Sequence, residues 1–374
     1  MFQKLERVIN SPLGAIGLEL EAQLRAVRDS VAAGAHDPGL LKYVVSKTEA
    51  VIEILPRNFG DRFWFDAEMI ESIKKSWSHQ GQRLSDTIIP NYGPEWSHAR
   101  DNIPSTPRSG QGKSINVVYI PGEDALDDID LLTYPFMCHE LGHNLFFYND
   151  SLFVGCFEDV LRKVVGSLRL RGLPDKGAAA LRAGRVIDEM QELWFPGLNH
   201  RNWAHETGMD MIAIWTCGPA YLAVFQDTIQ EGAKDPYLIT QEHPPYAVRV
   251  EALIKAAEQL GWSDYTRGLK RVVKEWRRSR WSTGLTNRYV ALADSRLVDA
   301  CVSCALDACE KLSLPKCDVK EIERVRGMVR RGGVPAFGTE LILAAWLVEQ
   351  QEGENGFELW ERATVRKLVD SITQ

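Results

Sequence analysis

The sequence predicts a mainly α-helical fold with one small β-sheet in its central part and additional helical regions at both ends. Three observations lead to this fold class. Apolar residues recur at intervals of three and four along most of the chain, which is the period of an amphipathic helix. A β-branched run closed by Pro-Gly, at 114–122, is typical of a strand. A stretch rich in Pro, Gly, Ser and Asn, at 89–113, predicts a long loop before that strand.

The helices are expected in a definite order along the chain. Two amphipathic helices are predicted near the N-terminus, at 16–34 and 39–55. Beyond the strand, the pattern predicts further elements in order: a helix at 134–147 that stops near 149–151, a helix at 157–170, a Gly- and Ala-rich stretch at 171–185, a loop at 194–202, a helix at 204–232 with a kink at Pro219, and a helix at 246–260. The rest of the chain is again mostly helical in pattern.

The length bounds the number of domains. A chain of 374 residues is long enough for two or three units, one of them with a substantial core. We expect a helical N-terminal region at 1–90, a central domain at 91–261 that holds the sheet, and a helical C-terminal region at 262–374.

Composition and charge argue against several classes of protein. Hydrophobic residues make up 45% of the chain and charged residues 25%, which is ordinary for a soluble globular protein. The net charge of -7 argues against a nucleic-acid binder, and we interpret the basic clusters at 274–281 and 324–333 as solvated helix faces. The N-terminus lacks the apolar core of a signal peptide. The longest uncharged stretch, 211–226, is too short for a membrane span and is interrupted by Gly218-Pro219.

The cysteines favour a reducing compartment. Seven cysteines, an odd number scattered through a chain of this size, fit a cytoplasmic protein better than a disulfide framework. The segment CVSCALDAC at 301–309, with Cys317 as a fourth thiol, allows a second metal site. The same spacing is equally that of a helix whose small thiols are buried, which is the reading we prefer.

The predicted helix at 134–147 carries polar residues in an apolar run. It reads YPFMCHELGHNLFF, with His139, Glu140 and His143 at its centre. In a helix, the two histidines stand one turn apart on one face and can hold one metal ion. Glu140 lies one position further round, where its carboxylate can act as a base without being a ligand. This HExxH pattern is typical of zinc metallopeptidases, although histidines satisfied inside a core helix remain the alternative.

A catalytic zinc site needs a third protein ligand. The residues that follow His143 lack the Gly and His that a metzincin has at the next positions, which excludes that class. In the segment NWAHETGMDMIA, Glu206 and Asp210 stand one helical turn apart among apolar residues, where carboxylates need a partner. We interpret Glu206 as the candidate ligand and Asp210 as a partner that fixes the tautomer of a ligand histidine. His205 is the alternative third ligand.

The order of these motifs resembles that of a known family. HELGH, then Glu206-x-x-x-Asp210, then HPPYAVR at 243–249 is similar to the gluzincin family of HtpX and the CAAX prenyl proteases. The strand segment NVVYIPG at 116–122 also resembles the one that precedes the zinc helix in that family. The resemblance implies a zincin-like metallopeptidase domain at 91–261 and one Zn²⁺ per chain. It also implies residue roles: His139, His143 and Glu206 as ligands, Glu140 as the base, and His243 and Arg249 as groups that stabilise the oxyanion or bind substrate.

The chain departs from this family in one respect, because the best-known members are embedded in a membrane and this sequence predicts no span. His243 also has a plainer reading, as a cap of the helix at 246–260. We therefore expect a soluble, cytoplasmic zinc endopeptidase. The strand at 114–119 is expected to lie at the sheet edge and to pair with an extended peptide or protein substrate, and a regulatory protein partner is expected to restrain the activity. The alternative is a non-catalytic zinc-binding scaffold or regulatory interaction protein.

Overall fold

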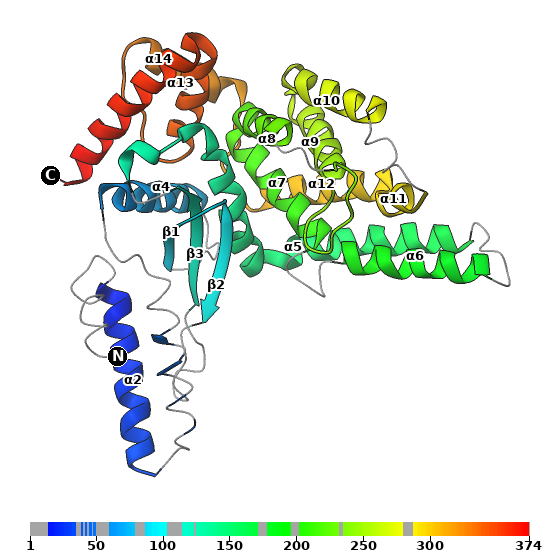
Figure 1. Ribbon diagram of the computed structural model, residues 1–374, viewed down its shortest axis with the longest axis horizontal. Coiled ribbons are helices and arrows are strands. Elements are labelled where there is room, and N and C mark those ends of the chain that lie inside the picture. Colours follow the sequence, from blue (N-terminus) through cyan, green and yellow to red (C-terminus); the bar gives the residue numbers. More distant parts are fainter. Residues whose placement is uncertain are drawn as a thin grey trace. The chain divides into compact units, whose positions relative to one another are not determined.

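The computed structural model describes most of the chain. The described residues are 14–34, scattered positions between 39 and 49, 60–78, 87–102, 114–122, 125–170, 178–195, 202–231, 235–279 and 287–373. They form a mainly helical fold with one small sheet (Figure 1), which confirms the predicted fold class. The predicted helix at 39–55 and the end of the predicted loop, 103–113, lie largely outside the described residues.

The chain divides into two compact units. The first comprises Met1–Glu71, Ser85–Ile129 and Arg362–Gln374, and the second comprises Ser72–Leu84 and Asp130–Glu361. The three-part division at 90 and 261 stays a prediction.

The first unit contains the sheet. Strands β1 (Thr87–Gly93), β2 (Ser97–Asn102) and β3 (Ser114–Pro121) lie in the order β1-β3-β2. Strand β1 runs parallel to β3, and β2 runs antiparallel to it, so that Val117 pairs with Ile89 on one side and Ala99 on the other.

Two sequence predictions for this region were wrong. The segment expected to be a loop from residue 89 holds β1 and β2, because its turn-forming residues separate short strands and do not abolish them. Strand β3 is the central strand and not an edge strand, so its backbone groups pair on both sides and are not available to a substrate.

The first unit also includes α2 (Gly14–Ala32), η1 (Leu126–Asp128) and the beginning of α4 (Asp61–Trp77). A buried polar cluster joins α4 to the sheet. Arg62 donates to the carbonyl of Pro121 at 2.8 Å and forms a 3.4 Å ion pair with Asp66, which accepts a hydrogen bond from Tyr92. Gly122, at a φ of 101°, lies so close to Arg62 that a Cβ there would be 2.9 Å from the guanidinium.

The second unit is helical. Its elements, in chain order, are η2 (Leu131–Thr133), α5 (Pro135–Leu170), α6 (Ala178–Trp194), α7 (Trp203–Cys217), α8 (Pro219–Glu231), α9 (Tyr246–Leu260), η3 (Ser263–Thr266), α10 (Arg267–Arg278), α11 (Asn287–Leu292), α12 (Ser295–Lys311), α13 (Val319–Arg330) and most of α14 (Thr339–Thr373), which is broken at Gly353. The basic residues of α10 are exposed, as expected for a solvated face.

Helix α7 is the centre of this unit. Every one of its residues is buried, and it packs against α5, α8, α9 and α12 (Figure 1). Its apolar residues cover all sides of the helix, which is typical of a fully enclosed helix. Any polar group that α7 carries must therefore find its partner inside the protein.

The helix boundaries differ from prediction at three places. Helix α5 does not stop at 149–151, because the chain kinks at Asn149 and continues to Leu170. At the kink, the Asn149 side chain donates to the carbonyl of Leu145 at 2.8 Å, which is the carbonyl that the backbone N–H of residue 149 would reach in a regular helix. The Gly- and Ala-rich stretch forms the start of α6 from Ala178. The predicted long helix is divided into α7 and α8 at Gly218, one residue before the expected kink.

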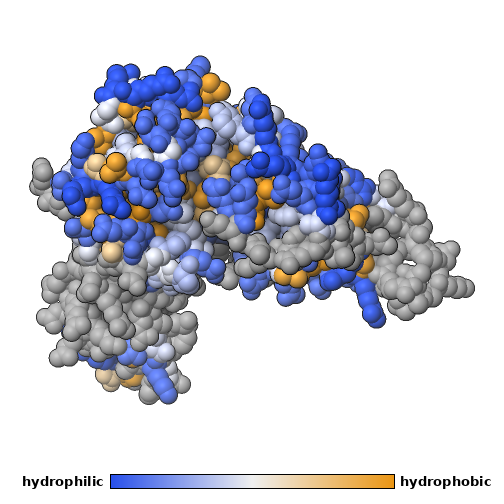
Figure 2. All heavy atoms as spheres, turned by 45° about the horizontal axis from the view of Figure 1, so that its top comes forward, coloured by the Kyte–Doolittle hydropathy of each residue, from blue (hydrophilic) through white to orange (hydrophobic). Residues whose placement is uncertain are grey.

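The described surface is mostly hydrophilic on the face that Figure 2 shows, with hydrophobic residues in small areas between the polar ones. In the described ranges, no helix combines the length and the hydropathy that crossing a membrane requires. The cytoplasmic location stays a prediction.

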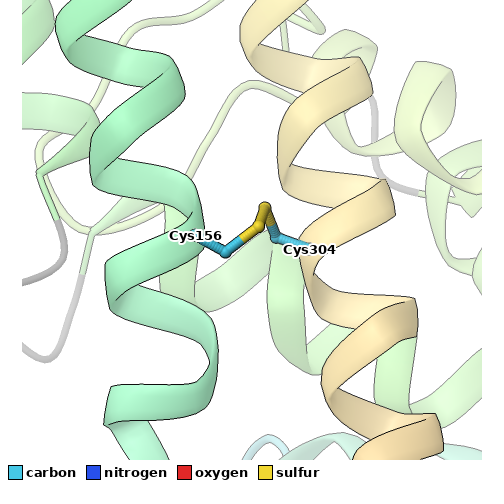
Figure 3. The surroundings of a disulfide bond; sticks show 2 residues. All are labelled: Cys156 and Cys304. Carbon is cyan, nitrogen blue, oxygen red and sulfur yellow. A yellow bond between two sulfur atoms is a disulfide. The ribbon is translucent and has the colours of Figure 1, made fainter.

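One disulfide links two helices of the second unit. Cys156 of α5 and Cys304 of α12 are bonded, with their Cα atoms 5.9 Å apart (Figure 3). The sequence reading, which preferred reduced thiols, did not anticipate this bond, since the two cysteines are 148 residues apart in the chain. The other five cysteines are buried thiols. In the 301–309 segment the preferred interpretation therefore holds for Cys301 and Cys309 and was wrong for Cys304.

We predict that Cys156→Ser lowers the free energy of unfolding by about 2–4 kcal/mol, because the disulfide closes a long loop and restricts the unfolded chain. Urea denaturation with and without a reductant measures this. The reduced parent should unfold at the same urea concentration as the variant. A variant that unfolds at the midpoint of the oxidised parent would show that the bond contributes nothing to stability.

Candidate metal centre

Helix α5 presents the HExxH residues to the interior of the second unit. His139 and His143 lie one turn apart, with their ring centroids 5.3 Å apart in a T-shaped arrangement. The His139 side chain is 5% exposed and that of His143 is 17% exposed, so one edge of the pair is nearer to solvent. Glu140 is also buried, and its Oε2 atom lies 4.0 Å from Nε2 of His143.

Helix α7 adds the third side chain. Asn202 caps this helix by accepting a hydrogen bond from the backbone of His205, which fixes the first turn that carries Glu206. The Glu206 carboxylate faces both histidines, with Oε2 3.5 Å from Nε2 of His139 and Oε1 3.6 Å from Nε2 of His143. The two helices thus bring together the three residues that the sequence identified as ligands.

These three side chains form a group that could hold a metal ion. One ligand atom from each of His139, His143 and Glu206 lies within 4.8 Å of the others, and this is the one such group among the described residues. Two imidazole nitrogens and one carboxylate oxygen form a donor set that catalytic zinc sites use. The chemistry of the residues therefore fits a zinc ion.

A glycine permits the close approach of the two helices. A Cβ atom at Gly142 would lie 2.9 Å from Sδ of Met209 and 3.2 Å from Cδ1 of Ile212, both on α7. The glycine between Glu140 and His143 thus has a packing role, because a larger residue would push α7 and its carboxylates away from the histidines.

Asp210 supports the site from behind. It lies one turn after Glu206, is fully buried, and accepts a hydrogen bond from Nδ1 of His139 at 3.0 Å. The hydrogen bond at Nδ1 leaves Nε2 as the ring nitrogen that is directed at the ligand group and could bind a metal ion. The structure thus places Asp210 where the sequence analysis expected it.

Two further residues hold the Asp210 carboxylate. Arg249 of α9 donates from Nε to Oδ2 at 2.8 Å and from Nη2 to Oδ1 at 2.6 Å. Tyr221 of α8 donates its hydroxyl to Oδ1 at 2.5 Å. The role of Arg249 toward substrate stays a prediction, and the structure shows its guanidinium bound to Asp210. Sequence reasoning missed Tyr221, because no motif marks it and its partner lies on another helix.

The buried charges compensate one another. Burial acts to raise the pKa of Asp210, but Arg249 and the hydrogen bond from His139 lower it to about 2. Burial acts to lower the pKa of His139, but hydrogen bonds with Asp210 and Glu206 raise it to about 10. Burial likewise opposes ionisation of Glu206, yet the histidines hold its pKa well below the usual range. A metal ion that binds Nε2 of His139 would therefore displace a proton.

His243 lies at the rim of the group. Its side chain is 56% exposed, and its Nε2 atom is 3.9 Å from Oε2 of Glu206. The loop before α9 holds it, with the Thr240 hydroxyl donating to its carbonyl at 2.6 Å. The reading of His243 as a helix cap was wrong, because Pro245 occupies the N-cap position of α9.

His205 is not part of the group. Its ring lies among aromatic side chains, with its centroid 6.3 Å from those of Phe146 and Phe153. Neighbouring residues on a helix point in directions about 100° apart. Glu206 therefore faces the histidines while His205 faces the aromatic cluster.

Comparison of the chain with protein family models, with curated proteins and with solved structures gives no match. The resemblance to the gluzincin family thus stays a prediction based on the motifs.

We predict that Glu206→Ala removes tightly bound zinc, because it deletes one of three ligand atoms, whereas His205→Ala retains about one zinc per chain. Metal analysis of the purified variants measures this. Asp210→Asn should retain zinc with an affinity about 10–100-fold lower, since it alters only the partner of a ligand. Loss of zinc in His205→Ala, with retention in Glu206→Ala, would show that the wrong neighbour was assigned.

We predict that Arg249→Ala weakens zinc binding and lowers the free energy of unfolding by about 3–5 kcal/mol, because it leaves the buried Asp210 carboxylate without its cation. Chelator competition and urea denaturation measure these effects. Arg271→Ala, which changes an exposed arginine of α10, is the control. An Arg249→Ala protein with the zinc affinity and stability of the parent would show that the buried Asp210 carboxylate does not depend on this arginine.

Proposed function

We propose that the chain is a zinc-dependent endopeptidase in which Glu140 is the general base. The observation that carries this proposal is the position of Glu140, which lies beside the group formed by His139, His143 and Glu206 without belonging to it. A site that only stabilises the fold has no need of a carboxylate in this place. A peptidase needs one there to accept a proton from water.

Zinc held by the three side chains would act as a Lewis acid toward a peptide carbonyl and increase the acidity of a water molecule. The Glu140 carboxylate accepts the proton of that water and then gives it to the nitrogen of the departing amine. His139 and Glu206 are almost fully buried, so their side chains keep their positions while the peptide bond is hydrolysed.

The more exposed side chains define where a substrate approaches. His143 and His243 are the solvent-accessible members of the centre, and both lie within 4 Å of Glu206. A peptide therefore reaches the ligand group from their side. The ring N–H of His243 is available to donate a hydrogen bond to the carbonyl oxygen as negative charge develops on it. Substrate pairing with β3 is not part of this proposal, because that strand is central in its sheet.

We predict that Glu140→Gln lowers peptide hydrolysis by about 10²–10⁴-fold while zinc content and thermal stability remain those of the parent, because only the proton acceptor is lost. Mass spectrometry of cleavage products from a denatured proteome measures the activity, and metal analysis of the same sample measures zinc. Glu258→Gln, which changes an exposed glutamate of α9, is the matched control.

Hydrolysis by Glu140→Gln at the parental rate would reject the assigned base. A parent protein that binds zinc and cleaves nothing would instead support the alternative, a non-catalytic zinc-binding scaffold.

A further inference from the structure

The junction between α7 and α8 returns the chain toward the metal centre. Gly218 adopts a φ of 54°, and a Cβ atom there would lie 2.6 Å from Sγ of Cys317. Asp210 and Tyr221 are 11 residues apart, and in an unbroken helix they would be separated by about 16 Å along the axis. The turn at Gly218 instead brings the Tyr221 hydroxyl to 2.5 Å from Oδ1 of Asp210.

This hydroxyl joins a carboxylate that is already engaged. Oδ1 of Asp210 lies 3.0 Å from Nδ1 of His139 and 2.6 Å from Nη2 of Arg249, while Oδ2 accepts from Nε of Arg249. The Tyr221 hydroxyl also lies 3.4 Å from Nδ1 of His139. The hydroxyl therefore lies next to both atoms of the hydrogen bond between Asp210 and His139, the acceptor Oδ1 and the donor Nδ1. Unlike the Arg249 guanidinium, the Tyr221 hydroxyl is a donor without a charge.

Aromatic rings fix the position of Tyr221. Its ring is fully buried and packs edge-on against Phe136 of α5, with ring centroids 5.7 Å apart, and at a tilt against Phe225 of α8, with ring centroids 6.0 Å apart. The Phe225 ring in turn covers the Arg249 guanidinium, with Cζ 4.8 Å from its centroid. These rings form an apolar wall behind Asp210, and hydrogen bonds in such a setting are stronger than in water.

We propose that Tyr221 is a positioning residue of the metal centre, which acts on the ligand His139 through Asp210. This inference rests on the proposed zinc site. Arg249 alone would hold both oxygens of Asp210 in the plane of its guanidinium. The Tyr221 hydroxyl adds a donor at Oδ1, which keeps this oxygen at the Nδ1–H group of His139. The ring is thereby held with Nε2 toward His143 and Glu206.

The test is the zinc affinity of Tyr221→Phe, measured by competition with a chelator of known affinity. The variant keeps the ring and both aromatic contacts, so we expect circular dichroism to show the parental fold. The expected result is zinc binding about 10-fold weaker, the lower end of the range for groups that orient a ligand. Tyr237→Phe is the control, since it removes the hydroxyl of a buried tyrosine of the same unit that lies outside the metal centre.

A double-mutant cycle separates positioning from packing. In an Asp210→Asn background, the effect of Tyr221→Phe on zinc affinity should shrink to less than about 2-fold, because the hydroxyl acts through the carboxylate. An undiminished effect in that background would overturn the proposal. So would a Tyr221→Phe protein that is less heat-stable but binds zinc within about 2-fold of the parent.

The readout also distinguishes this inference from the proposed function. Zinc binding does not require hydrolysis, so a failure of the Glu140→Gln test rejects the peptidase and leaves the role of Tyr221 standing. A parent chain that binds no zinc overturns both.

Discussion

The buried carboxylate of Asp210 is the group on which the second unit depends. It lies on a helix with no exposed residue, where an isolated charge would cost many kcal/mol. Three other helices each supply a donor to it: α5 through His139, α8 through Tyr221 and α9 through Arg249. The requirement to satisfy one carboxylate thus fixes four helices around one point. The same hydrogen bonds orient His139, so the folding of this unit and the geometry of the candidate metal site depend on the same contacts.

Two glycines allow the helices to pack closely around Asp210. Gly142 allows α5 to approach α7, and Gly218 turns the chain from α7 into α8. Neither glycine supplies an atom to the group formed by His139, His143 and Glu206. Both decide whether the donors reach Asp210, because interhelical distances and directions are set by the side chains at the closest contacts. A larger residue at either position would shift the helix backbone and so alter the distances between Asp210 and its donors.

The sequence was sufficient to predict those residues of the site whose positions follow from the helical period. His139 and His143, and likewise Glu206 and Asp210, are four residues apart, so the helical period alone predicts that each pair shares a face. The polar residues Glu206 and Asp210 in an apolar helix also indicated a buried partner. The sequence could not show Tyr221, the disulfide or the central place of β3, because each depends on which distant segments pack together. The kink at Asn149 was misread as an end, since the same residue types serve both purposes.

The charges of the centre bear on the role of Glu140. The positive charge of Arg249 compensates the negative charge of Asp210. The charge of Glu206, together with that of any bound ion, is then left to be compensated in this buried site. Without a metal ion, the positive charge of protonated His139 compensates the negative charge of Glu206. A divalent ion that replaces this proton brings one more positive charge than Glu206 balances, and a second nearby carboxylate restores neutrality. Glu140 is the described carboxylate in that position, 4.0 Å from His143. The carboxylate that we propose as the general base thus also lies where it could balance the charge of a bound divalent ion.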